Sequence, residues 1–299
     1  MVESADSRAA RLFATDRSVR RRRIVNRVME TLASLAALAA VGVLVIVVIS
    51  VLKNAWPALN VELFTTSPSI SAFGEAEGGI LNAIVGSIVL VAFATLFAVP
   101  IGVLVAIYVS ELAPRRIANA IRLALDVING IPSIVLGIFM FSAIVLSQGQ
   151  SALAGSAALA IIALPLVARS TQEVLRLVPS SYREAGLALG APRWRTVLGV
   201  ILPTSLGGIL TGTTLAIARV AGETAPLLFT CALAGQAVTW DPRQPVQSLP
   251  LTIFQYAEQP DPSYHTQAWA AGAILLFFVL VVSLISKFFL ARSRRKLAR

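Results

Sequence analysis

Six stretches of the chain are apolar and have the length of membrane-spanning helices. They cover residues 31–52, 80–110, 124–146, 152–167, 204–234 and 269–290. A helix rises about 1.5 Å per residue, so roughly 20 apolar residues cross a hydrocarbon core of about 30 Å. Helices satisfy their backbone polar groups internally, which that core requires. The sequence therefore predicts an all-α polytopic membrane protein with six transmembrane helices.

The basic residues gather beside these stretches in the pattern of the positive-inside rule. A basic tail at 1–29 includes four consecutive arginines, and a second basic tail occupies 291–299. The loop at 53–79 carries three glutamates against one lysine, which is typical of an extracytoplasmic segment. This asymmetry predicts that both termini are cytosolic.

The composition excludes nucleic acid as a partner, although the net charge is +10. Hydrophobic residues make up 57% of the chain, charged residues make up 13%, and the mean hydropathy is +0.79. This is the composition of a membrane protein, and the basic residues lie beside its apolar stretches. No basic groove with interleaved aromatic residues is present in the sequence. A basic N-terminus could also begin an export signal, but the apolar run at 31–52 exceeds an h-region of about 7–15 residues. We expect it to be a retained first transmembrane helix.

The chain lacks the residues of a catalytic or metal centre. Its one cysteine, Cys231, and one histidine, His265, exclude a disulfide framework and a Cys/His zinc cluster. No Gly-x-x-x-x-Gly-Lys-Ser/Thr motif is present, so this chain does not bind ATP by that route. We therefore expect a non-catalytic membrane subunit that binds no cofactor itself.

One long polar segment, residues 169–203, interrupts the second half of the chain. Apolar residues recur in it at helical spacing, with charged residues on the other faces. Pro179 and Pro192 each predict the start of a short helix, because proline suits a first turn and breaks an interior. Gly190 predicts a stop between the two helices. Such helices could hold a partner protein or lie on the membrane surface as an ordinary loop.

This segment resembles the signature of the transmembrane permease subunits of ABC importers. Glu184-Ala185-Gly186 is followed by Gly190 and, after nine residues, by Val200-Ile201-Leu202-Pro203. The usual signature has Ala where Gly186 stands and Ile where Val200 stands. The resemblance implies a coupling segment at 169–203 that contacts an ATPase. Its contact residues would be Glu184, Ala185, Gly186, Gly190, Leu202 and Pro203.

Four further runs resemble the PstA-type branch, the permeases of phosphate importers. They are GILNAIVGS at 79–87, GIPSIVLG at 130–137, GETAPLLFT at 222–230 and LPLTIFQY at 249–256. The resemblance implies a permease domain at 80–290 in a bacterial cytoplasmic membrane. It also implies the following partners: a PstC-like sister permease, a PstB-like ATPase dimer that uses ATP and Mg²⁺, and an extracytoplasmic phosphate-binding protein.

Two charged residues, Arg219 and Glu223, fall inside the fifth predicted span. Four residues apart on a helix they share a face and can form an ion pair, which makes buried charges tolerable. Alternatively, Arg219 presents its guanidinium fork to passing inorganic phosphate and Glu223 holds it in place. We expect the second arrangement, on the substrate path.

Two other kinds of transporter fit part of the pattern. An ABC importer permease for sulfate, molybdate or an amino acid would share the coupling signature but not the four phosphate-type runs. An ion-coupled secondary transporter would show an internal repeat with broken helices in matching positions. The polar insertion at 169–203 has no counterpart in the first half of the chain. An added role in reporting phosphate status stays compatible with the sequence.

Overall fold

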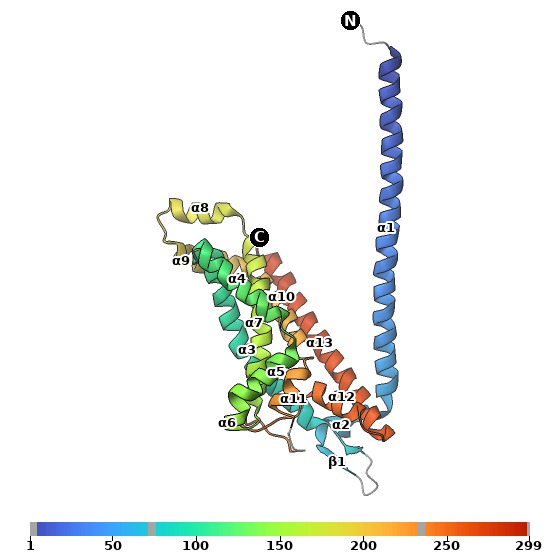
Figure 1. Cartoon of the computed structure of the whole chain (residues 1–299), viewed down its shortest axis with the longest axis vertical. Coiled ribbons are helices and arrows are strands. Elements are labelled where there is room, and N and C mark those ends of the chain that lie inside the picture. Colours follow the sequence, from blue (N-terminus) through green and yellow to red (C-terminus); the bar gives the residue numbers. More distant parts are fainter. Residues whose placement is uncertain (1–4, 71–75, 233–236, 298–299) are drawn as a thin grey trace. The chain divides into compact units, whose positions relative to one another are not determined.

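A computed structural model describes residues 5–70, 76–232 and 237–297. By its internal contacts the chain divides into two units, 1–53 and 54–299. The first unit is one long helix, α1 (Ala5–Ala55), whose last two residues extend past the division. Figure 1 shows the elements of both units with their labels.

Helix α1 is longer than the predicted span at 31–52, because it continues through the basic tail as one helix of 51 residues. The tail is rich in Ala and Arg, which are strong helix formers, and it contains no Pro or Gly. Asn26 donates a hydrogen bond of 2.9 Å from Nδ2 to Glu30 Oε1, one turn further on. The stretch from Val19 to Ala58 is long and apolar enough to cross a membrane.

The second unit is built from helices and one small hairpin. In chain order its elements are η1 (Trp56–Ala58), α2 (Val61–Thr65), β1 (Pro68–Ile70), β2 (Ala76–Gly78), α3 (Leu81–Ile107), η2 (Tyr108–Leu112), α4 (Arg115–Gly130), α5 (Ser133–Met140), η3 (Phe141–Val145), α6 (Leu146–Gln148), α7 (Ala152–Arg176), α8 (Ser180–Ala188), α9 (Arg193–Thr196), η4 (Val197–Ile201), α10 (Leu202–Val220), α11 (Ala225–Thr230), α12 (Leu249–Ala257) and α13 (Pro262–Leu297). Segments η2, η3 and η4 are π-helical. Strands β1 and β2 pair antiparallel within the segment predicted as a loop.

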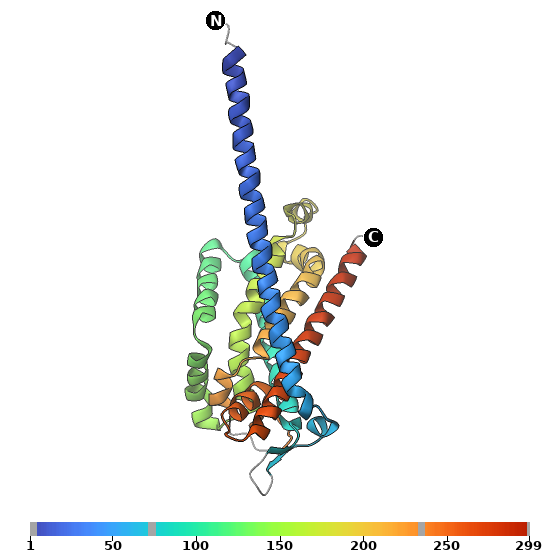
Figure 2. The same ribbon diagram turned by 90° about the vertical axis from the view of Figure 1, so that its right-hand side faces the viewer.

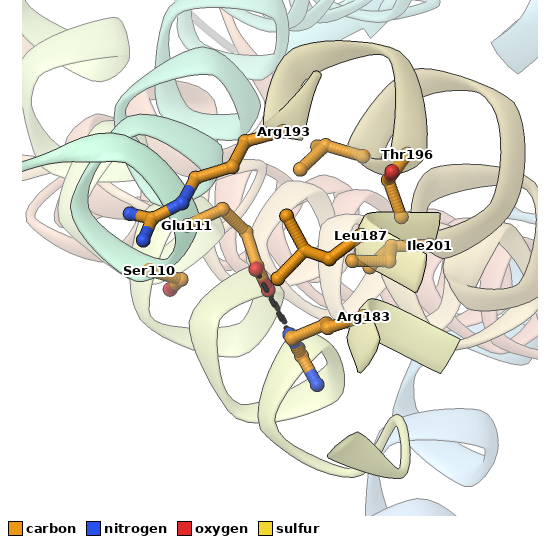
Figure 3. Close-up of a pocket in the computed structure, with 8 residues that line it drawn as sticks. Ser110, Glu111, Arg183, Leu187, Arg193, Thr196 and Ile201 are labelled. Carbon is orange, nitrogen blue, oxygen red and sulfur yellow. Dashed lines mark hydrogen bonds and ion pairs between the residues drawn. The ribbon is translucent and has the colours of Figure 1, made fainter. Parts of the chain in front are cut away.

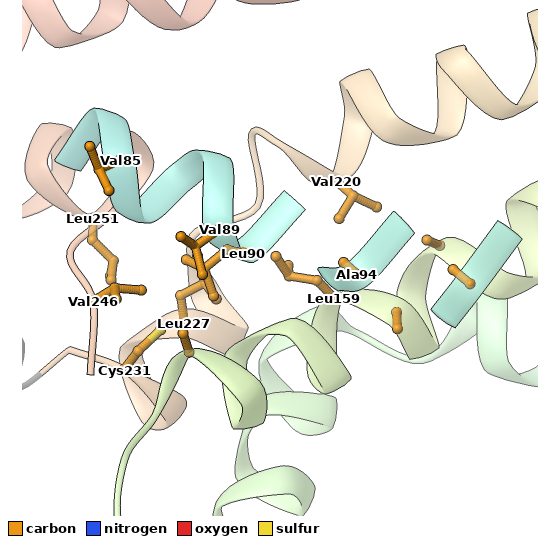
Figure 4. Packing of buried hydrophobic residues seen from close by; sticks show 14 residues of the cluster. Val85, Val89, Leu90, Ala94, Leu159, Val220, Leu227, Cys231, Val246 and Leu251 are labelled. Carbon is orange, nitrogen blue, oxygen red and sulfur yellow. The ribbon is translucent and has the colours of Figure 1, made fainter. Parts of the chain in front are cut away.

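The core forms where α3 packs along α7 and where α10 covers α7 and α13. A cluster of buried apolar side chains joins α3, α7 and α11 to the segment before α12 (Figure 4). Leu90, Leu159 and Leu227 are almost fully buried in it. Many of the other members are alanines, which let the helix backbones approach closely.

The third predicted span, 124–146, is wrong as a single helix. Helix α4 ends at Gly130, α5 begins at Ser133, and the two axes differ by 96°. Pro132 explains the break, because it lacks an amide hydrogen and disfavours the helical conformation of the residue before it. The pair α4 and α5 is therefore either a broken span or a re-entrant loop.

The fifth predicted span, 204–234, is also divided. The helical stretch begins earlier, at Arg193, and α10 ends at Val220, before a turn that leads to the short α11. Gly222 disfavours helix, and Pro226 favours the start of a new one. The predicted end of this span, at residue 234, lies outside the described residues.

Within the described residues, five helical stretches can cross a membrane, or six if the bent pair counts as one. The predicted all-α polytopic architecture is confirmed, with the β1–β2 hairpin as a small addition. In Figures 1 and 2, α8 and α9 lie at the same end of the second unit as the C-terminal end of α13. Helices α2 and α12 lie at the opposite end.

Candidate functional site

The predicted pair of short helices is present as α8 and α9, and each begins directly after its proline. Pro179 is the N-cap residue of α8, and Pro192 is the N-cap residue of α9. Helix α8 ends in a Schellman motif: Ala191 N–H donates to Gly186 O at 3.0 Å, and Gly190 N–H donates to Leu187 O at 2.9 Å. Gly190 has a φ of +71°, a conformation that favours glycine.

The outer side of this helix pair is exposed and partly apolar. Glu184 and Ala185 are exposed, and Leu189 and Trp194 keep 87% and 53% of their surface accessible. Gly186 faces inward, since a Cβ atom on it would lie 2.4 Å from Thr196 Oγ1. The structure thus brings Glu184, Ala185, Gly186 and Gly190 together on one short helix and its turn.

Leu202 and Pro203 lie apart from these four residues, at the start of α10. Leu202 packs against a buried cluster formed by Ile107, Leu175, Val197 and Ile201. Pro203 supplies no N–H for a regular helical bond, and the turn before it is the π-helical segment η4. Leu202 therefore anchors the end of the coupling segment to α3 and α7.

A buried ion pair joins α8 to the end of α3 (Figure 3). Arg183 donates from Nη2 to Glu111 Oε1 at 2.6 Å and from Nε to Oε2 at 2.9 Å. The Glu111 side chain is only 7% exposed and that of Arg183 is 31% exposed. The hydrogen bond to Glu111 raises the pKa of the Arg183 guanidinium, so Arg183 stays charged. Beside it lies a cavity of about 290 Å³, lined in part by Arg193 and Thr196.

Arg219 lines a second cavity, where the two helix breaks meet. This cavity has a volume of about 220 Å³. Its walls come from the α4–α5 break, from α7, from the last turn of α10 and from the turn before α11. The lining residues are Ile128, Asn129, Ile131, Pro132, Ser133, Leu136, Ile162, Leu166, Arg219 and Glu223. Irregular backbone at membrane depth is tolerated where it lines a cavity, as it does here.

Arg219 and Glu223 do not share a helix face, which corrects the geometry expected from their spacing. Helix α10 ends at Val220, and Glu223 follows in a turn in which its N–H donates to Val220 O. Among the described residues, neither side chain makes an ion pair or a hydrogen bond. Both side chains nevertheless line the same cavity.

A second ion pair fixes one wall of this cavity. Arg169 on α7 pairs with Asp126 on α4, and its Nη2 also donates to Arg122 O at 3.2 Å. The Asp126 side chain is largely exposed, so the pair contributes at most about 1 kcal/mol. It holds α4 against α7 just before the bend.

Sequence reasoning missed Glu111, Asn129 and Ser133. Glu111 ends an apolar run directly before a basic loop, and that position is typical of an ordinary flanking charge. Its partner is 72 residues away in the sequence, so only the folded structure shows the pair. Asn129 and Ser133 flank Pro132, and their position beside Arg219 follows from the 96° bend.

Residues 98–299 match the family described as "Binding-protein-dependent transport system inner membrane component". The chain belongs to this family. The match covers the C-terminal end of α3, the coupling segment and both cavities, so family and geometry concern the same residues.

Relatives of known name point to one branch of the family. The "Phosphate transport system permease protein PstA" of Haemophilus influenzae is 40% identical over 235 residues, which is 78% of this chain and 82% of the relative. The protein of the same name from Xylella fastidiosa Temecula1 is 38% identical over 286 residues, or 94% of this chain and 98% of the relative. PstA 1 of Mycobacterium tuberculosis H37Rv is 34% identical over 283 residues, covering 93% and 92%.

Solved structures of the same fold include other importers. An inward-facing form of the MetNI methionine ABC transporter aligns with a TM-score of 0.55, at 20% identity, over 72% of this chain and 94% of that one. An amino acid ABC transporter aligns with a TM-score of 0.53 at 19% identity, over 69% and 90%. These structures support the fold of this chain. The five or six helical stretches that can cross a membrane agree with that fold.

Proposed function

We propose that this chain is the permease subunit of an ATP-driven importer of inorganic phosphate. The observation that carries the proposal is the 34–40% identity to PstA proteins over most of the chain. The cavity at Arg219 supports it, because an unpaired guanidinium beside polar side chains suits a tetrahedral oxyanion. Transport needs binding that is weak enough to release, and one arginine without a closed cage fits that need.

The proposal includes the orientation and the partners of the chain. Helices α8 and α9 and the end of α13 lie at one end of the second unit, and we place that end in the cytosol of a bacterium. There the exposed side of α8 and α9 receives a PstB-like ATPase dimer that uses ATP and Mg²⁺. A PstC-like sister permease completes the path, and an extracytoplasmic phosphate-binding protein delivers the anion. We place the N-terminus in the cytosol as well, by the charge of its tail.

The mechanism follows from these positions. ATP binding closes the two halves of the ATPase and moves α8 and α9. The spans that continue from them then alternate between outward-open and inward-open arrangements around the cavity at Arg219. Arg219 attracts the anion, and Asn129 and Ser133 offer further hydrogen bonds from the facing wall.

The proposal is tested by radiolabelled phosphate uptake in cells that lack their own importer and receive this chain with its presumed partners. We expect uptake that survives collapse of the proton gradient, fails after ATP depletion and disappears when the ATPase is omitted. Uptake by this chain without partners, stopped by a protonophore, would instead indicate a secondary transporter. Competition by arsenate, a phosphate mimic, but not by sulfate, molybdate or amino acids would separate phosphate from the other solutes.

Replacing Gly190 with valine is expected to reduce uptake while the chain still inserts. No atom lies within 4 Å of a Cβ on Gly190, so the substitution acts through the backbone φ of +71°. That conformation costs other residues about 1–2 kcal/mol, and more for a β-branched one. Gly190→Asn is the matched control, because asparagine tolerates this conformation. Equal uptake by the valine and asparagine variants, at equal membrane levels, would show that the Schellman turn does not matter for coupling.

A further inference from the structure

Besides the three-residue linker 177–179 that joins it to α7, helix α8 is connected to the rest of the second unit by two routes. The first is the chain that follows it, through the turn at Gly190 to α9, η4 and α10. Gly186 strengthens this route, because α8 approaches Thr196 at a position where a Cβ atom would collide. The backbone of α8 accordingly packs against α9 and η4.

The second route is the side chain of Arg183, which makes four hydrogen bonds. Two reach Glu111 at the end of α3. Nη2 also donates to Leu175 O at 3.0 Å, near the C-terminus of α7, and Nη1 donates to Val178 O at 2.8 Å in the linker before α8. The last carbonyls of a helix lack partners within the helix, so Arg183 also caps α7. One guanidinium thus binds η2, which continues α3, the last turn of α7 and the linker before α8.

The two routes lead to different walls of the cavity at Arg219. The chain route continues into α10, which carries Arg219 in its last turn. The Arg183 route leads to α3 and α7, which pack along each other, and α7 carries Ile162 and Leu166 of the cavity wall. A displacement of α8 therefore reaches the α7 wall through a direct side-chain contact only while the Arg183 route is intact.

We propose that Glu111 and Arg183 are a positioning pair that transmits movement of α8 to the α3–α7 helix pair. The inference rests on the proposed function, since the movement it transmits is driven by the ATPase. Near-complete burial of the Glu111 carboxylate and the bidentate geometry make this connection stiff, unlike a solvated surface pair. Without the pair, movement of α8 reaches α7 only through the linker 177–179 and through the packing of α10 on α7, so the ATPase would turn over with a smaller movement of that wall.

The test uses the whole importer reconstituted in liposomes, with phosphate uptake and ATP hydrolysis measured on the same preparation. We expect Glu111→Gln and Arg183→Gln each to lower the phosphate transported per ATP hydrolysed by about tenfold, with ATP hydrolysis within about twofold of the wild type. The double variant should be no worse than either single variant, because both remove one connection. Glu258→Gln is the matched control, since that exposed carboxylate makes no contact among the described residues, and its ratio should not change.

A parallel fall of uptake and hydrolysis, with an unchanged ratio, would overturn the inference, because it is what a purely structural role predicts. An unchanged uptake in all variants would overturn it as well. Failure of the wild-type importer to take up phosphate with ATP would contradict the proposed function instead.

Two further measurements keep the inference testable if the glutamine variants assemble poorly or if the transported solute is another one. In Glu111→Cys with Arg183→Cys, a reducible bifunctional thiol reagent replaces the ion pair by a covalent bridge, and Cys231 is fully buried. Bridging should restore transport at least severalfold, and reduction should remove that gain. Transport that is the same with and without the bridge would contradict the inference.

Amide exchange of residues 180–188, measured without nucleotide, should be faster in Glu111→Gln than in Glu258→Gln. Equal exchange would show that the pair does not hold α8.

Discussion

Replacing Arg219 with glutamine is expected to reduce phosphate uptake by roughly 10- to 100-fold while the chain still reaches the membrane. A hydrogen bond to a charged group contributes about 1.5–3 kcal/mol, and each 1.4 kcal/mol corresponds to a factor of ten. Arg219 has no partner among the described residues, so its loss leaves no other charge unpaired. The effect should therefore appear in uptake and not in the amount of folded protein.

Arg219→Lys is the informative companion of this variant. Lysine keeps the positive charge but replaces the planar fork of donors by a single ammonium group. We expect uptake between those of the wild type and Arg219→Gln, with the remaining activity more sensitive to added salt. Unchanged uptake in Arg219→Gln would remove this residue from the substrate path. Loss of the protein from the membrane would indicate that Arg219 serves the fold.

Replacing Gly86 with alanine is expected to destabilise the second unit by about 3 kcal/mol, at the upper end of the usual cost of overpacking. A Cβ atom on Gly86 would lie 1.8 Å from Gln247 O, a backbone atom that cannot rotate away. The adjacent hydrogen bond, from Leu249 N–H to Ser87 Oγ at 2.8 Å, would be strained by the same shift. For a domain of this size, the loss corresponds to a thermal midpoint roughly 6–12 °C lower.

The single cysteine provides the measurement. Cys231 is fully buried in the same cluster as Val246, so a thiol-reactive dye labels it as this region unfolds. The matched control is Gly272→Ala on α13, where no atom lies within 4 Å of the added Cβ. That control should be unchanged or more stable by up to about 1 kcal/mol, because alanine favours helix over glycine. Equal midpoints for the two variants would mean that the approach of Gln247 to α3 is not tight.

Much of the fold could be predicted because apolar length and proline position act locally. Pro179 and Pro192 determine where α8 and α9 begin, and Gly190 determines where α8 ends. The errors arose where a polar break interrupts an apolar run. The runs at 124–146 and 204–234 are apolar enough on average to suggest one helix each, but Pro132 and Pro226 each start a new helix inside them. Hydropathy does not register such breaks, because lipid-facing and cavity-lining residues can be equally apolar.

Some residues of the candidate site could likewise be predicted from the sequence, and others could not. The residues that share α8 and its turn could be predicted from their spacing, because four of them lie within seven positions. The expected pairing of Arg219 with Glu223 assumed a continuous helix, and the end of α10 at Val220 removed that assumption. Glu111 could not be assigned, because its contact with Arg183 depends on how α3, α7 and α8 come together.

The packing of the segment before α12 against α3 has a consequence for synthesis of the protein. Ser87 and Leu249 are 162 residues apart, yet they form one hydrogen bond beside the contact of Gly86 with Gln247. At about 5–20 residues per second, the ribosome needs roughly 8–30 s to reach the second partner after the first. During that interval the nascent α3 stays in the bilayer, and its surface at Gly86 and Ser87 is not yet covered by residues 247–249. Truncated chains that stop before residue 246 should therefore be degraded faster by membrane proteases. Full-length chains cover this surface of α3 with their own residues.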